Sequence, residues 1–216
     1  MKLRCLKSLL LASVACLLQA SCTVYQVQAP VKSCTTPDPV KVLLLPAPSQ
    51  TIVNVRVYIA PGFSERERAN VVNGISLWER ATGGKVGWTL VGSAPEANSL
   101  QTVDGVKTLY VVYQRVAPDD LRVKRWEKEH NDETMLGQLS IGYDDNVPAS
   151  PMEVILIESR LTSPRDEMLI AAHEFGHVLG LDHTTSRGSV LSEKYGLTVQ
   201  GITSADIGLF CARYGC

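Results

Sequence analysis

Alternation of apolar and polar residues predicts a series of β-strands in the first two thirds of the chain. Val53, Val55 and Val57 alternate with polar or amphipathic neighbours, a period of two that is typical of a half-buried strand. Similar short segments rich in β-branched and aromatic residues follow, separated by turn residues. The further strand candidates are residues 85–91, 106–114, 135–143 and 152–158.

A period near 3.6 residues predicts helices between and after these strands. Ser64 and Glu67 have the spacing of a capping box, and Val71, Ile75 and Trp78 follow on one helical face. Residues 122–130 carry many charges, which indicates a solvated helix face. A last helix is expected from residue 203 or 204 to about residue 213, with Ile207 and Phe210 facing inward.

A further helix is predicted around residues 163–179. Ser163 suits the N-cap, Pro164 the first helical position, and acidic residues follow in the first turn. An apolar stripe formed by Met168, Ala172, Phe175 and Leu179 is expected to face the core. These elements together predict an α+β fold with a twisted mixed sheet.

Composition indicates one globular domain preceded by an extended segment. The chain has 216 residues, of which 45% are hydrophobic and 20% charged, enough for one sizeable core. Prolines are frequent in residues 22–50, so we expect a linker or stalk there and a folded domain at residues 51–216. The net charge of −1 gives no electrostatic reason to expect nucleic-acid binding, and the sequence does not indicate an oligomeric state.

The N-terminus is typical of an export signal. Lys2, Arg4 and Lys7 precede an apolar run, residues 9–18, that is too short for a membrane span. Residues 17–22 resemble the cleavage box of bacterial lipoproteins, which implies a signal peptide at 1–21, acylation of Cys22 and membrane attachment. Ordinary cleavage after Ala20, giving a periplasmic or secreted protein, is the alternative.

If the chain is exported, we expect its cysteines to form disulfide bonds, because disulfides persist outside the cytosol. One arrangement joins Cys211 to Cys216 and leaves Cys34 free, and another joins Cys34 to one of those two. The sequence does not choose between these pairings.

The resemblance of residues 17–22 to lipoproteins, with Thr23 after the anchor, would favour the outer membrane in a Gram-negative host.

Residues 173–183 fill every fixed position of the motif HExxHxxGxxH. His173 and His177 lie one helical turn apart, so both imidazoles can bind one metal ion. Gly180 can adopt the left-handed conformation that ends the helix, and the chain can then return to present His183. Three neutral imidazoles leave an open position on Zn²⁺ for water, and Glu174 is placed to act as a general base.

This eleven-residue run resembles the zinc signature of the metzincin metallopeptidases, and residues 180–183 resemble the matrixin branch most closely. The resemblance implies a zincin-like catalytic domain, with His173, His177 and His183 as zinc ligands and Glu174 as the catalytic residue. It also implies a zinc-dependent endopeptidase that cleaves protein or peptide substrates through attack of zinc-bound water.

Metzincins have a methionine-bearing turn below the metal, and the corresponding residues here are 189–192. Leu191 stands where methionine is expected, and because the two side chains have similar volumes we expect a hydrophobic floor to remain. Some branches carry a functional tyrosine two residues further on, where this chain has Glu193. Tyr195 is close by in the sequence but out of register.

Three further hypotheses concern regulation, calcium and substrate binding. Residues 34–38 partly resemble the matrixin cysteine switch, so Cys34 is a candidate latency ligand. The oxygens of Asp144, Asp145 and Asn146 could bind calcium, although a polar turn explains them better because they lack the ligand spacing of a known calcium loop. By the same resemblance, the strand at 136–143 would flank the cleft and pair with an extended peptide.

Two other functions stay open at this stage. One is a non-catalytic zinc-containing module that binds a cell-envelope partner, although Glu174 would then have no role. The other is a hydrolase of peptidoglycan cross-links, which would share the zinc chemistry.

Overall fold

A computed structural model describes residues 51–94, 101–103, 106–131, 134–144, 147–192 and 199–215. The chain separates into two units, Met1–Pro39 and Val40–Cys216, and every described residue lies in the second. Among the described residues, no helix is long and apolar enough to cross a membrane.

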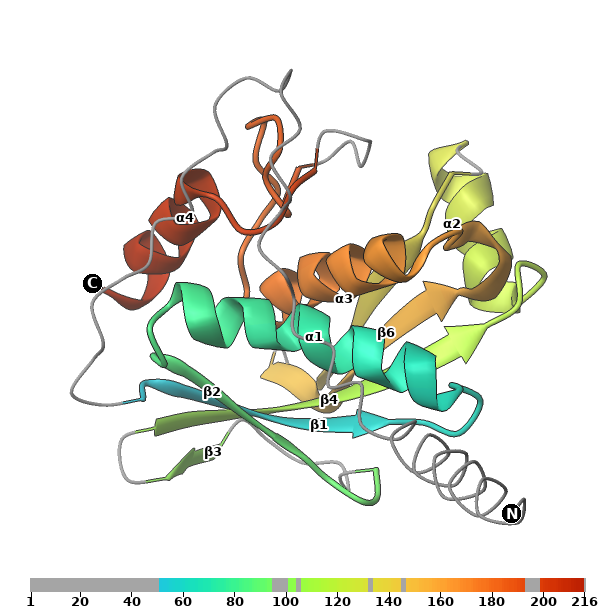
Figure 1. Cartoon of the computed structure of the whole chain (residues 1–216). Helices are drawn as coiled ribbons and strands as arrows, with labels where there is room; N and C mark the ends of the chain where they lie inside the picture. The colour runs from blue at the N-terminus through green and yellow to red at the C-terminus, as the bar shows by residue number, and fades with distance from the viewer. Residues whose placement is uncertain are drawn as a thin grey trace, which may run out of the picture. The chain divides into compact units, whose positions relative to one another are not determined.

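A mixed six-stranded sheet forms one layer of the domain (Figure 1). Its main path has the order β2-β1-β4-β6-β5, and a short strand, β3, pairs with β4. The β5 strand runs antiparallel to β6, whereas β1, β2, β4 and β6 are mutually parallel. The strands are β1 (Val53–Ile59), β2 (Val86–Leu90), β3 (Gln101–Val103), β4 (Val106–Val116), β5 (Gly137–Asp144) and β6 (Val147–Ile157).

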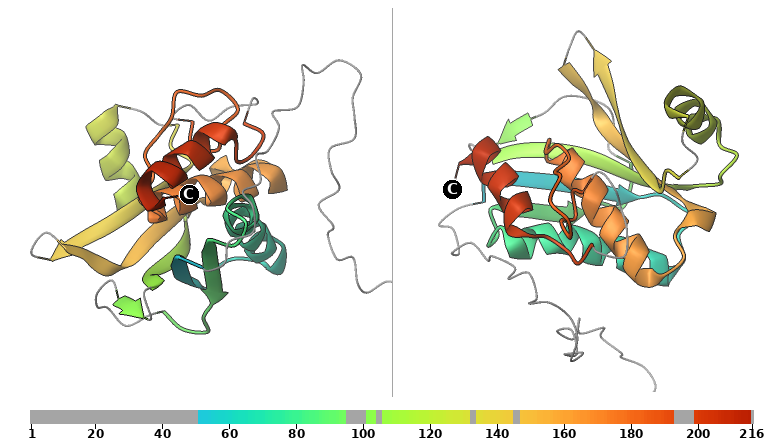
Figure 2. Two further views of the ribbon diagram at one scale, coloured as in Figure 1. Left: turned by 90° about the vertical axis from the view of Figure 1, so that its left-hand side faces the viewer. Right: turned by 90° about the horizontal axis from the view of Figure 1, so that it is seen from above.

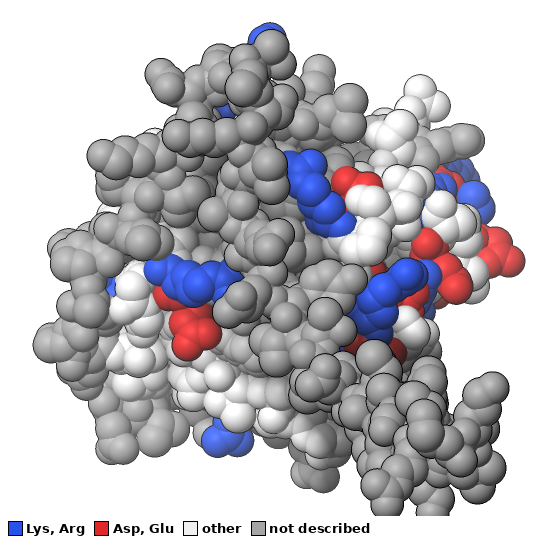
Figure 3. All heavy atoms as spheres, viewed as in Figure 1, with Lys and Arg blue, Asp and Glu red and all other residues white. Residues whose placement is uncertain are grey.

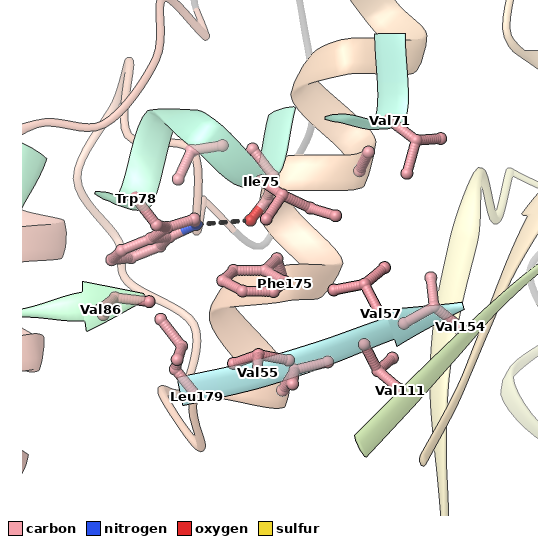
Figure 4. Packing of buried hydrophobic residues seen from close by; sticks show 14 of the residues in the cluster. Val55, Val57, Val71, Ile75, Trp78, Val86, Val111, Val154, Phe175 and Leu179 are labelled. Atoms are coloured by element: carbon pink, nitrogen blue, oxygen red, sulfur yellow. Dashed lines mark hydrogen bonds between the residues drawn. The ribbon is translucent and has the colours of Figure 1, made fainter. Parts of the chain in front are cut away.

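Two helices, α1 (Glu65–Ala81) and α3 (Pro164–Val178), lie side by side on one face of this sheet (Figures 1 and 2). The main core lies between them and the strands. Phe175 of α3 lies above Val55 and Val57 of β1, with Trp78 of α1 beside it (Figure 4). All four side chains are fully buried, so the metal-motif helix is the centre of the core.

The helix α2 (Leu121–His130) packs on the opposite face of the sheet. Successive strand residues point to opposite faces. On β6, Val154 and Leu156 belong to the main core, whereas Ile155 and Ile157 join a second cluster with Val123 of α2. This second cluster also contains Val116 and Met135, with Trp126 packed against it.

The C-terminal helix α4 (Ser204–Tyr214) contributes Ile207 and Phe210 to the main core. Cys211, on the same helix, is disulfide-bonded, and the chain's other cysteines lie outside the described residues. On the face shown in Figure 3, several of the described basic side chains lie beside acidic ones.

The sequence correctly predicts most of these elements. The Ser64–Glu67 capping box and the Ser163 cap of α3 are both present. Two expectations need correction. Residues 101–103 form β3, although only a loop was expected there. The helix α3 is also buried well beyond the predicted stripe, through Leu169, Ile170 and Val178, because it packs between α1, the sheet and the segment before α4.

Candidate metal centre and active site

The helix α3 supplies two of the three motif histidines, and the chain then leaves the helix so that the third histidine can lie beside them. His173 and His177 are one turn apart near its C-terminal end. Gly180 has φ +74°, and the N–H groups of Gly180 and Leu181 bond to the carbonyls of His177 and Gly176, at 2.8 and 3.0 Å. This is a Schellman motif, and it reverses the chain so that His183 returns toward the helix.

The three imidazoles converge through their Nε2 atoms. The separations are 3.1 Å for His173–His177, 3.2 Å for His177–His183 and 3.3 Å for His183–His173. Ligands at roughly 2.0–2.1 Å in tetrahedral array are about 3.3 Å apart, so this triangle has the size that zinc requires. It is the one His, Cys, Asp and Glu cluster among the described residues suited to a metal.

Backbone carbonyls hold the two helical imidazoles in place. Nδ1 of His173 lies 2.7 Å from the Val190 carbonyl oxygen, and Nδ1 of His177 lies 2.8 Å from that of Leu181. Each Nδ1 must therefore carry the proton and donate it, which leaves each Nε2 lone pair for a metal. Burial lowers the pKa of His173 to about 4 and also lowers that of His177, favouring the neutral form that binds metal.

Glu174 lies beside this triangle in a dry environment. Its side chain is buried, and burial raises its pKa to about 8 in the metal-free protein. The backbone N–H of Leu139 in β5 donates a hydrogen bond to the carboxylate, which opposes that rise. A carboxyl group with such a pKa can both accept and return a proton near neutral pH.

The strand β5 approaches Glu174 closely because residue 137 is glycine. A Cβ at Gly137 would lie 3.0 Å from Glu174 Oε1 and 2.9 Å from Ile170 Cγ2. Any side chain there would therefore displace the carboxylate or the strand.

The turn at residues 189–192 lies below the metal site, as the sequence predicts. Leu191 is fully buried, and its side chain fills the space that a Cβ at Gly176 would enter, at 2.6 Å. Leucine thus provides the hydrophobic floor in place of methionine, and glycine at position 176 makes room for it.

A buried carboxylate, Asp206 of α4, holds this turn. It accepts hydrogen bonds from the Ser189 hydroxyl, from the Leu191 N–H at 3.1 Å, and from the N–H and hydroxyl of Thr203 at 2.7 and 2.8 Å. Since the same turn carries the Val190 carbonyl that orients His173, Asp206 supports a candidate metal ligand indirectly.

Two other buried side chains, one from α1 and one from β4, hold α3 in place through hydrogen bonds to its backbone. Trp78 Nε1 donates to the Ala172 carbonyl at 2.7 Å (Figure 4), and the Tyr113 hydroxyl donates to the Ala171 carbonyl at 3.0 Å. Ala171 and Ala172 are the two residues before His173, so α1 and β4 each hold the helical turn that leads into the metal motif.

A cleft of about 1090 Å³ opens over the site. Its lining includes the three histidines, Glu174, residues of β5, and Trp126 of α2. Among the described strands β5 pairs with β6 alone, so its other edge borders the cleft.

The register shows which backbone groups β5 presents to that edge. The Ile157 N–H donates to the Leu136 carbonyl at 3.0 Å, so Leu136 and Ile157 form a hydrogen-bonded pair. Along an antiparallel ladder, hydrogen-bonded pairs alternate with pairs that are not hydrogen-bonded. The N–H and C=O groups of Gly137 and Leu139 therefore point away from β6, as the Leu139 bond to Glu174 requires.

The structure thus brings together all four residues singled out from the motif. Glu193, Tyr195, Cys22, Cys34 and Cys216 lie outside the described residues, as do Asp145 and Asn146 of the calcium hypothesis. Sequence reasoning did not identify Leu139, Gly137, Trp78, Tyr113 or Asp206. Only Asp206 carried a local signal, the spacing of Thr203 and Asp206 that is typical of a helix start.

The metal-motif helix is set against a mixed sheet, and its two histidines form with His183 a cluster suited to a metal ion. Residues 119–208 match the matrixin family model, and the chain is matrixin-like. No curated protein matches the sequence. Similar solved structures include metalloproteinase-II from Bacteroides fragilis, with a TM-score of 0.46 and 13% identity over 83% of this chain. The match spans 59% of the length of that protein.

Proposed function

We propose that the protein is an exported zinc-dependent endopeptidase, in which His173, His177 and His183 hold the metal and Glu174 is the general base. The observation that carries the proposal is the triangle of Nε2 atoms beside a buried carboxyl group. A purely structural zinc site would not need that carboxyl group.

The chemistry divides between the metal and the chain. Zinc, when bound, supplies Lewis acidity, which polarises a carbonyl and lowers the pKa of water toward neutral. Glu174 takes the proton from the attacking water and delivers it to the leaving nitrogen of the cleaved bond. The Leu139 N–H keeps the carboxylate aimed at the reacting groups during both transfers.

Substrate binding is assigned to the edge of β5. An extended peptide adds to a free sheet edge through backbone hydrogen bonds, and beside Glu174 this edge presents the N–H and C=O of Gly137 and the C=O of Leu139. Because the cleft runs along the strand, a peptide can extend past the metal in both directions. This favours cleavage within a chain.

Export and anchoring complete the proposal. Residues 1–21 act as a signal peptide, residues 22–50 form a linker, and Cys22 is the acylated residue that attaches the domain to the cell envelope. The disulfide bond at Cys211 supports an oxidising compartment. Mass spectrometry of the membrane fraction tests this point, since an unmodified N-terminus at residue 21 would contradict acylation.

Cleavage of a mixed peptide library by the zinc-loaded protein tests the activity. A zinc-loaded Glu174→Ala variant with a matched melting temperature is the control. We expect the variant to lose at least a hundredfold in kcat/KM, the lower end of the contribution of general acid–base catalysis. Equal inactivity of both proteins on peptides would contradict a peptidase and favour a binding module or a peptidoglycan substrate.

A further inference from the structure

The cleft extends beyond the metal site to an aromatic side chain on the opposite side of β5. Trp126 of α2 lines the cleft together with Met135 and Leu136, which precede β5, and Gly137, its first residue. The lining near the metal site includes polar side chains, those of Asp182, His183 and Ser192. An apolar contact surface therefore lies at one end of the edge strand.

The position of α2 is fixed by buried contacts. Val123 is fully buried in the second cluster. Glu127, 7% exposed, accepts hydrogen bonds from Arg160 and from Lys124, and Arg160 also donates to the Met135 carbonyl at 2.9 Å. The same contacts thus join α2, Met135 and the segment after β6.

The ring of Trp126 is itself held in one orientation. His130 stacks on it, with ring centroids 4.4 Å apart and an interplanar angle of 18°. Nδ1 of His130 lies 2.9 Å from the Trp126 carbonyl oxygen, which holds the imidazole in place. Because His130 covers one face of the indole, the cleft meets the other face or the ring edge.

A peptide paired with β5 sends its side chains alternately to the two faces of the sheet. Those on the α3 side face the metal site, and those on the other side face α2. Glu127, the acidic residue next to Trp126, is already paired with Lys124 and Arg160, so it offers no free charge to a substrate and a neutral apolar side chain fits the indole surface better than a basic one.

We propose that Trp126 and Met135 form a specificity subsite for a large apolar or aromatic residue on the C-terminal side of the cleaved bond. This inference rests on the proposed peptidase function. Antiparallel pairing, the more stable arrangement, places the C-terminal part of the peptide along the start of β5. Met135 precedes Gly137, which contacts Glu174, by two residues or roughly 7 Å. The subsite therefore receives the second or third residue after the cleaved bond.

Cleavage of peptides that differ only at these two positions tests the proposal. The zinc-loaded wild-type protein should prefer Phe or Leu over Gly there, and Trp126→Ala should reduce this preference about three- to tenfold, as expected for one aromatic contact. Trp126→Phe should keep most of it. Trp88→Ala, on the strand β2 at the other edge of the sheet, is the matched control and should leave the preference unchanged.

A binding measurement gives an independent readout. Peptides with Phe at the preferred position should change the tryptophan fluorescence of the Glu174→Ala protein, and the change should be absent when Trp126→Phe is added. An active wild-type protein whose preference does not depend on Trp126, or depends on it only before the cleaved bond, would overturn the subsite. Inactivity of the wild-type protein on every peptide would instead overturn the peptidase function.

Discussion

At the scale of single residues, the site depends on two glycines, which leave space for neighbouring side chains, as well as on the residues that carry its chemistry. Gly176 leaves room for Leu191 below the metal ligands, and Gly137 leaves room for Glu174 beside β5. At each position an added Cβ would come within 3.0 Å of a side chain with a role at the site, Leu191 at 2.6 Å from position 176 and Glu174 at 3.0 Å from position 137. A methyl group at position 137 would therefore press on the Glu174 carboxyl group, whereas one at position 176 would press on the buried side chains of Leu191 and Trp78.

Gly137→Ala should lower activity with little effect on stability. The added Cβ would meet two side-chain ends, at 2.9 and 3.0 Å, which can move without unfolding the core. Moving the Glu174 carboxylate by a few tenths of an ångström to 1 Å should cost roughly 10- to 100-fold in kcat/KM.

Kinetics on one good peptide, together with a melting temperature, check this expectation. Gly208→Ala is the matched control, because a Cβ at Gly208 meets nothing within 4 Å. Replacing a glycine inside α4 should stabilise that helix by about 1 kcal/mol and leave kcat/KM unchanged. Wild-type activity in Gly137→Ala would show that the close approach has no catalytic consequence.

At the scale of elements, the metal motif lies within one short stretch of sequence, whereas the residues that hold it in place come from distant parts of the chain. Both ends of α3 follow from neighbouring residues, Ser163 at one and Gly180 at the other. For this reason the helix, its bounds and the convergence of the histidines could be predicted from the sequence.

The hydrogen bonds that distant residues make to α3 could not be predicted, because the sequence of a strand or a turn does not specify which distant residue it will contact. Leu139 bonds Glu174 across 35 positions, and the Trp78 indole bonds Ala172 across 94. The antiparallel direction of β5 and its place at the sheet edge likewise depend on how the strands assemble. The β3 strand was missed because three residues are too few for a periodic pattern.

Asp206→Asn should weaken metal binding through the turn at residues 189–192. An amide can accept at one oxygen only, so one or more of the four donors to the carboxylate would lose its acceptor. We expect a loss of about 2–3 kcal/mol in unfolding free energy and roughly 10- to 100-fold in zinc affinity.

A zinc titration against a competing chelator measures the affinity, and urea unfolding of the metal-free protein measures the stability. Tyr113→Phe is a useful comparison, because it removes one hydrogen bond to α3 without touching the turn. A loss of stability in Asp206→Asn with unchanged zinc affinity would contradict the link from Asp206 through Val190 to His173.

At the scale of the whole molecule, the core is built from apolar side chains of elements that lie far apart in the sequence. The main cluster joins β1, α1, β4, β6, α3 and α4 through apolar contacts, and carbonyls already orient the imidazoles of His173 and His177. Zinc should therefore stabilise a structure that forms without it.

Removal of zinc should leave the secondary structure intact and lower the melting temperature. At a free zinc concentration a thousandfold above Kd, binding contributes about 4 kcal/mol, or roughly 8–16 °C for a domain of this size. Circular dichroism and calorimetry before and after chelation check this, and zinc should restore both activity and melting temperature. Loss of the far-ultraviolet signal on chelation would show that the metal is needed for folding.

The irregularity in β5 has a consequence for solubility. Pairing with β6 is regular from Gly137 to Ser140, and the register then shifts before Gly142. The straight part of the edge is thus four residues long, or about 13 Å, and the bulge twists the rest away. An edge of this length can bind one extended peptide, but it is a poor template for the stacking of identical strands into fibrils.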